Sequence, residues 1–123
     1  MGTERSDLGR LGEDKAAEYL GNAGYEIVVR NYRCRSGEID IIARDTECLV
    51  FVEVKSRRDT RFSAPSEAVD IRKQRKIIAS CRQYLIDNEM DEVSCRFDVV
   101  EVYFNNSQPI RVSHLPGAFC DEG

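Results

Sequence analysis

Charged residues interrupt two neighbouring hydrophobic segments of this chain, and this feature constrains the fold most. Residues 38–42 read Glu-Ile-Asp-Ile-Ile, and residues 49–55 read Leu-Val-Phe-Val-Glu-Val-Lys. Both segments have the β-branched, apolar composition of strands. Asp40 lies in the first, and Glu53 and Lys55 lie in the second. Because a charge buried without a partner or a metal is costly, the sequence predicts that these three charges have a function.

The spacing between the two segments predicts a β-hairpin. A four-residue turn at residues 45–48 places Asp40 opposite Glu53 in antiparallel strands. Such cross-strand partners have Cβ atoms about 5 Å apart. Lys55 shares the face of Glu53, because side chains alternate along a strand. A register shifted by one residue would put Asp40 on the opposite face.

The close pair of carboxylates predicts a divalent-metal site. Two such groups repel each other unless a positive charge lies between them, and their hard oxygen atoms suit Mg²⁺ or Mn²⁺. The strand would offer the backbone carbonyl of Val54 as a further ligand. The metal would activate water and act as a Lewis acid, and Lys55 would orient that water or stabilise charge on phosphorus. This chemistry cuts phosphodiester bonds. The alternative is an ordinary surface network in which Glu53 pairs with Lys55 or an arginine.

Glu13 is a candidate fourth ligand. It follows Gly12 in residues 7–22, where apolar residues recur at three- and four-residue intervals and predict a helix, with Ser6 as N-cap and Gly24 as the stop. A glycine inside a helix costs about 1 kcal/mol relative to alanine, which favours a close backbone approach at Gly12. The alternative is that Glu13 is an ordinary exposed helix residue.

The charge is distributed unevenly along the chain. Its net value is −4, but residues 1–29 carry −3, residues 30–82 carry +5 and residues 83–123 carry −6. A local positive potential attracts a polyanion whatever the total charge, so nucleic acid is the expected partner. A histone-like coating protein is disfavoured. The predicted phosphate contacts, each with solvation as the alternative, are Arg33, Arg35, Arg57, Arg58, Arg61, Arg72, Lys73, Arg75 and Lys76.

The remaining pattern predicts one α/β domain spanning residues 1–123, with a core of about 7–115 and a flexible C-terminal tail. The expected order is α-β-β-β-α-β-β. The elements after the first helix are strands at 25–32, 38–44 and 48–55, a basic loop at 56–65, a helix from Ser66 to about Asn88, and strands at 95–104 and 110–112. Asp98, in the fourth of these strands, is expected to be a structural or supporting carboxylate.

Other composition features exclude several classes of protein. Neither a membrane span nor a signal peptide is predicted, so we expect a cytoplasmic protein with no membrane partner. Five cysteines without CxxC spacing are expected to be reduced thiols. His114 is the only histidine, which excludes sites that need two imidazoles and favours a surface or packing role for it.

Several separated motifs of the chain resemble the YraN-like family over about residues 7–115. They are Gly12-Glu13-x-x-Ala16, Gly24-Tyr25, residues 37–43, residues 51–55, Lys73-Gln74 and residues 96–100. That family is considered a branch of the PD-(D/E)XK nuclease superfamily, similar to archaeal Holliday junction resolvases, with an αβββαβ core around a central mixed sheet. The resemblance implies that Asp40 and Glu53 bind metal, that Lys55 is the catalytic lysine, and that Glu13 completes the site. Ile39 stands where the wider superfamily often has proline.

The expected function is therefore a Mg²⁺- or Mn²⁺-dependent endonuclease for branched or otherwise structured DNA, such as Holliday junctions. A non-catalytic accessory protein that binds nucleic acid with the same fold is the alternative. A protein-interaction module using the acidic C-terminal third is a third interpretation. A resolvase is expected to be a homodimer, because two symmetric nicks in a four-way junction need two active sites.

Overall fold

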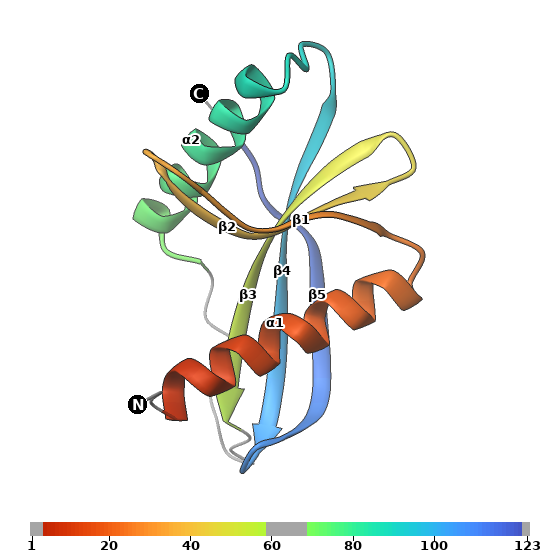
Figure 1. Ribbon diagram of the computed structural model, residues 1–123, viewed down its shortest axis with the longest axis vertical. Helices are drawn as coiled ribbons and strands as arrows, with labels where there is room; N and C mark the ends of the chain where they lie inside the picture. The colour runs from red at the N-terminus through yellow and green to blue at the C-terminus, as the bar shows by residue number, and fades with distance from the viewer. Residues whose placement is uncertain (1–3, 59–68, 122–123) are drawn as a thin grey trace.

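The chain forms two helices and five strands (Figure 1). The computed structural model describes residues 4–58 and 69–121, with side chains from residue 8 onward. The elements are α1 (Glu4–Asn22), β1 (Glu26–Cys34), β2 (Gly37–Asp45), β3 (Cys48–Arg58), α2 (Ile71–Asp87), β4 (Ser94–Asn105) and β5 (Gln108–Phe119). The predicted element order is confirmed.

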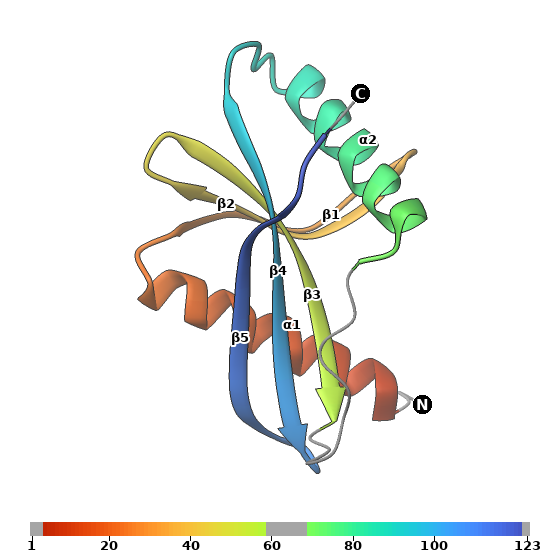
Figure 2. The ribbon, with the colours of Figure 1, turned by 180° about the vertical axis from the view of Figure 1, so that it is seen from behind.

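The strands form one mixed sheet in the order β1-β2-β3-β4-β5. Neighbouring strands are antiparallel except β3 and β4, which are parallel and are joined through α2. A parallel pair needs a crossover connection of this kind. Helix α1 crosses one face of the sheet, and α2 packs on the other face beside β1 and β2 (Figure 2). This α/β architecture is consistent with the expected nuclease-like core.

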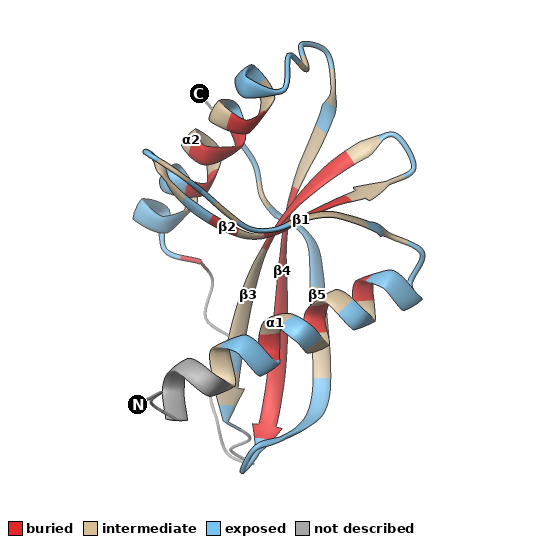
Figure 3. Cartoon of the chain, viewed as in Figure 1, coloured by how far each residue is buried: buried red, intermediate tan, exposed pale blue. Residues whose placement is uncertain are grey.

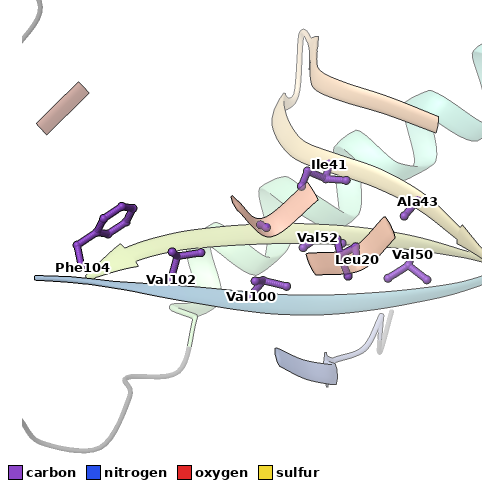
Figure 4. Close-up of a cluster of buried hydrophobic side chains, with 9 residues drawn as sticks. Leu20, Ile41, Ala43, Val50, Val52, Val100, Val102 and Phe104 are labelled. Atoms are coloured by element: carbon purple, nitrogen blue, oxygen red, sulfur yellow. The ribbon is translucent and has the colours of Figure 1, made fainter. Parts of the chain in front are cut away.

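Two hydrophobic clusters hold the helices to the sheet. The cluster under α1 contains Leu20, Ile41, Val52, Val100 and Phe104 among its members (Figure 4). The cluster under α2 is built on other residues of the same strands, with helix residues packed on them. Strand β3 supplies both clusters, since alternate side chains point to opposite faces. Strand β4 is therefore largely buried and β3 is buried over its first half, whereas the edge strands are more exposed (Figure 3).

Helix α1 begins earlier than predicted and ends where predicted. It starts at Glu4, so Ser6 lies inside the helix and is not its N-cap. Gly24 adopts a φ of +99°, a conformation that favours glycine, and the N–H of Tyr25 donates a 3.0 Å hydrogen bond to the carbonyl of Leu20. This pattern satisfies the last carbonyls of the helix, which confirms Gly24 as the stop.

Helix α2 begins at Ile71, so the predicted start at Ser66 is wrong. Asp70 is the N-cap: its carboxylate accepts a 2.7 Å hydrogen bond from the backbone N–H of Arg72. Val69 is not helical, and Ser66 lies outside the described residues. The signal for the true start was an aspartate directly before the helical pattern.

The strands differ from the predictions mainly in length. Strand β3 runs to Arg58 because it pairs with β4 along its whole length, so residues 56–58 are strand and not loop. The rest of the predicted loop lies outside the described residues. Arg33 and Cys34 belong to β1 and not to the turn. Strand β5 extends over residues 108–119 because it follows β4, where only 110–112 was predicted.

Candidate metal and nucleic-acid site

Strands β2 and β3 separate at the predicted site. Their backbone ladder ends at the pair Ile41–Val52, in the register predicted from the turn. Beyond that pair β2 remains paired with β1, and β3 remains paired with β4. The Asp40 carboxylate lies in this opening, where its Oδ2 accepts a 2.8 Å hydrogen bond from the backbone N–H of Val54. We call this opening, formed by Asp40, Glu53 and Val54, the fork.

Asp40 and Glu53 interact directly in the fork. Burial, followed by the charge of Asp40, raises the pKa of Glu53 to about 7. Burial also raises the pKa of Asp40, against hydrogen bonds from the Val54 N–H and from Glu53 that lower it. A protonated Glu53 therefore donates a hydrogen bond to Asp40. Ionisation of both carboxyl groups in the fork is therefore unfavourable unless a bound cation compensates their charge.

Lys73 lies beside this pair, a placement that the sequence interpretation missed. Its Nζ is 3.4 Å from Oε2 of Glu53, whose side chain is only 12% exposed. The charge of Lys73 lowers the pKa of both carboxyl groups, although burial outweighs it. Lys73 was predicted as a phosphate contact, and its described partner is Glu53. Lys73 stands in the first turn of α2, and its contact with Glu53 depends on how that helix packs against the sheet.

Glu13 approaches the fork from α1. A Cβ atom on Gly12 would collide with Oγ of Ser56, so the predicted close approach at Gly12 is confirmed. The Ser56 hydroxyl donates a 3.1 Å hydrogen bond to the carbonyl of Leu8, which fixes α1 against β3. Burial and the charge of Asp40 raise the pKa of Glu13, against the effects of neighbouring Arg and Asn side chains. Glu13 is thus within electrostatic reach of Asp40.

The donor atoms of the fork suit a hard divalent cation, but the set is incomplete in this arrangement. Asp40 and Glu53 supply carboxylate oxygens whose pKa values are raised by burial, and for Glu53 also by the charge of Asp40. Within residues 4–58 and 69–121, no three carboxylate, imidazole or thiolate groups already lie close enough to hold a metal ion. A cation that replaces the shared proton fits the pair, and Glu13 would have to move toward it.

Lys55 follows Glu53 on β3 and is half-buried. The register of β3 and β4 puts it beside Glu101. Glu101 is 1% exposed and forms an ion pair with Arg57, whose Nε lies 2.6 Å from Oε2 of Glu101. Arg57, predicted as a phosphate contact, therefore neutralises a buried carboxylate, and Lys55 borders a sheet surface rich in charge.

The other predicted phosphate contacts are spread over three places. Arg33 is exposed on β1 with its Nε 3.4 Å from Glu38, and Arg35 is exposed in the β1–β2 turn. Arg58 is exposed at the end of β3, and Arg61 lies outside the described residues. The largest group is on α2, where Arg72, Arg75 and Lys76 are exposed.

Asp98 and His114 form a buried network on the α1 face. Asp98 is 0% exposed, and its oxygens lie 2.9 Å from Nε of Arg96 and 2.7 Å from Nε2 of His114. The His114 ring also makes edge contacts with Tyr19 and Tyr25. Burial raises the pKa of Asp98, but hydrogen bonds from His114 and Arg96 outweigh it, so the pKa lies below its ordinary value. This placement agrees with a structural carboxylate and a packing histidine.

Two further expectations bear on the class of protein. All five cysteines are free thiols. Among the described residues, no helix has the length and apolar character that a membrane crossing requires.

The chain matches the uncharacterised protein family UPF0102 over residues 12–102, a range that contains all the candidate residues of the fork. This is the YraN family, so the resemblance seen in the motifs is confirmed. The relatives cover nearly the whole chain. A UPF0102 protein of Desulforamulus reducens is 45% identical over 121 residues, which are 96% of this chain and 99% of the relative.

Two other relatives are similarly close. A UPF0102 protein of Desulforapulum autotrophicum is 46% identical over 119 residues, or 97% of this chain and 98% of the relative. One of Frankia casuarinae is 45% identical over 112 residues, or 91% of this chain and 95% of the relative. The names of these relatives state the family and no activity.

Proposed function

This chain belongs to the uncharacterised protein family UPF0102, and we propose that it is a divalent-metal-dependent endonuclease that hydrolyses phosphodiester bonds in nucleic acid. Branched DNA, such as a Holliday junction, is the proposed substrate class. The observation that carries the proposal is the pair Asp40 and Glu53, two carboxylates with raised pKa values that meet in the fork. Lys55 follows Glu53 by two residues on the same strand, and this spacing supports its proposed role as the catalytic lysine.

The proposed ligands of Mg²⁺ or Mn²⁺ are Asp40, Glu53 and the carbonyl of Val54, with Glu13 as the fourth group. When bound, the metal supplies a Lewis acid and an activated water. Glu53 must lose its proton before it can serve as a ligand, which favours activity above pH 7. Lys55 orients the attacking water and stabilises negative charge on the phosphoryl group.

A cleavage panel tests this proposal. Four-way junctions, flaps, linear duplexes and single strands are incubated with the protein and either Mg²⁺ or Mn²⁺. We expect at least one of these DNA substrates to be cut, and we expect Asp40→Asn and Glu53→Gln to lower the rate about 100-fold or more. Asp14→Asn is the matched control, because Asp14 is an exposed carboxylate on α1 that pairs with Arg30.

Wild-type activity in the Glu53→Gln variant would overturn the proposal. Calorimetric titration with Mn²⁺ adds a readout that needs no turnover: the wild type should bind the ion, and Asp40→Asn should bind it far more weakly. Paired symmetric nicks in a four-way junction would further indicate a homodimer, since one domain offers one fork.

The incomplete donor set favours a second candidate function, an accessory protein that binds nucleic acid without cutting it. Under this alternative, binding would weaken steeply with salt and no substrate in the panel would be cleaved with either metal. The same panel therefore separates the two functions.

A further inference from the structure

An open groove lies between the β1–β2 turn and the first half of α2. It has a volume of about 630 Å³, and its lining includes Ser36 from the turn and Arg72, Arg75 and Lys76 from the helix. Asp70 also lines it, but the Asp70 carboxylate already accepts a hydrogen bond from the backbone of Arg72 as the helix N-cap. The groove is therefore predominantly basic.

The three cations of the groove remain available to a ligand. All are exposed, and none forms an ion pair with another residue in the described part of the chain. Two other arginines predicted as phosphate contacts do have acidic partners, Arg33 in Glu38 and Arg57 in Glu101. Three neighbouring cations that form no ion pair within residues 4–58 and 69–121 repel one another, so an anion bound among them is favoured.

The wall of the groove is set by close packing. Gly37 has a φ of +148°, and a Cβ atom there would lie 3.6 Å from Cβ of Lys76 and 3.4 Å from Oγ of Ser80. The β1–β2 turn thus rests directly on α2, and Ser36 and Lys76 are held near each other. The packing of the turn against the helix therefore defines this side of the groove, which does not depend on one flexible side chain.

The groove lies near the fork along α2. Lys73, which contacts Glu53, and Lys76, which lines the groove, are three residues apart on the helix, so their side chains are neighbours. Their positions are separated by a rise of about 4.5 Å along the helix axis. A nucleic-acid strand that presents one phosphate to the fork can therefore present another to the groove.

We propose that this groove, lined by Ser36, Arg72, Arg75 and Lys76, is a phosphodiester-binding site that holds the nucleic-acid backbone on the α2 side of the fork. The choice of nucleic acid as the source of the phosphate rests on the proposed function. Three of the nine basic residues predicted as phosphate contacts line the groove. The bound nucleic-acid strand would therefore run from the fork toward the β1–β2 turn.

The test is a binding experiment that needs no cleavage. Fluorescence anisotropy with a labelled DNA junction is measured over a range of salt concentrations, in Glu53→Gln protein. We expect that introducing Arg75→Gln and Lys76→Gln together into this protein weakens DNA binding about 10-fold or more at low salt. The slope of log affinity against log salt should fall by about 1 to 2, because each lost phosphate contact lowers it by about 0.9.

The control pair is Lys15→Gln and Arg44→Gln, which also removes two positive charges but lies outside the groove. Equal loss of binding in the two pairs would overturn the proposal. The proposal would also be overturned if the protein bound inorganic phosphate in the groove but bound no DNA, because the groove would then be a site for small anions. If DNA binds through the groove but is never cut, the groove stands and the nuclease proposal fails.

Discussion

At the scale of single residues, the protonation of Glu53 governs the candidate site. An ordinary glutamate is ionised at neutral pH, but burial beside Asp40 holds the pKa of Glu53 at about 7. Protonation and metal binding therefore compete for the same oxygens, and both relieve the same repulsion. The sequence interpretation identified the two carboxylates from their strand spacing. It could not identify Lys73 as their neighbour, because that contact depends on how α2 docks against the sheet.

The pKa of Glu53 predicts a pH dependence of stability in metal-free protein. The folded state holds a proton on Glu53 that the unfolded chain releases near pH 4.5, so the contribution of Glu53 to stability is largest below that pH and is lost as pH rises through about 7. We expect the loss to be on the order of 1–3 kcal/mol between pH 5 and pH 8. Urea titrations in EDTA measure it directly.

Glu53→Gln is the informative variant for this effect, since glutamine keeps the hydrogen-bonding shape without titrating. Its stability should change much less between the two pH values. Adding Mn²⁺ at pH 8 should restore the stability of the wild type and leave the stability of the variant unchanged. A wild type that gains stability as the pH rises from 5 to 8 would contradict the predicted direction.

At the scale of elements, the β2–β3 hairpin was predictable from the sequence, whereas the start of helix α2 was not. The β2–β3 register followed from a short local turn, whereas the true length of β3 depends on parallel pairing with a distant strand. Ser66 and Asp70 are both good N-cap types, so sequence pattern alone did not separate them. Gly12 was recognised because a glycine inside a helix is unfavourable without a packing reason.

The contact between α1 and β3 predicts the effect of Gly12→Ala. The added methyl group collides with Ser56, so we expect a loss of about 1–3 kcal/mol in the free energy of unfolding and weaker Mn²⁺ binding through displaced Glu13. Gly9→Ala is the control, because a Cβ atom at Gly9 would meet nothing within 4 Å. That change should be neutral or stabilise the helix by up to about 1 kcal/mol. Equal effects of the two changes in urea titrations would show that α1 does not rest on Ser56.

At the scale of the whole molecule, the Asp98 network ties the second half of the sheet to α1. Asp98 accepts hydrogen bonds from Arg96, from the backbone N–H of Gly117 and at the ring of His114, and Arg96 donates to the Tyr25 hydroxyl at 2.7 Å. The sequence marked Asp98 as a charge in an apolar strand. Its partners His114 and Gly117 come from β5, and no local pattern predicts this contact between distant residues.

The network predicts that Asp98→Ala destabilises the protein strongly while leaving the fork chemically intact. Removal of the carboxylate leaves Arg96 and His114 without their buried acceptor, so we expect a loss of about 3–5 kcal/mol in urea denaturation. Glu18→Ala, which removes an exposed carboxylate paired with Lys15, should cost less than about 1 kcal/mol. At a temperature where the variant is folded, its affinity for Mn²⁺ should match that of the wild type. A comparable loss in both variants would mean that the network carries little stability.

The parallel pairing of β3 with β4 also dictates the order in which the site can be assembled. The β2–β3 hairpin closes through neighbouring residues, on a timescale of about 1–10 μs for such hairpins. The β3–β4 ladder joins residues 48–58 to residues 94–104 and must await the longer loop closure through α2. Until β4 arrives, the carboxylates of the hairpin are surrounded by water and keep ordinary acidity. During synthesis the fork is therefore completed late, once residues 94–104 have left the ribosome.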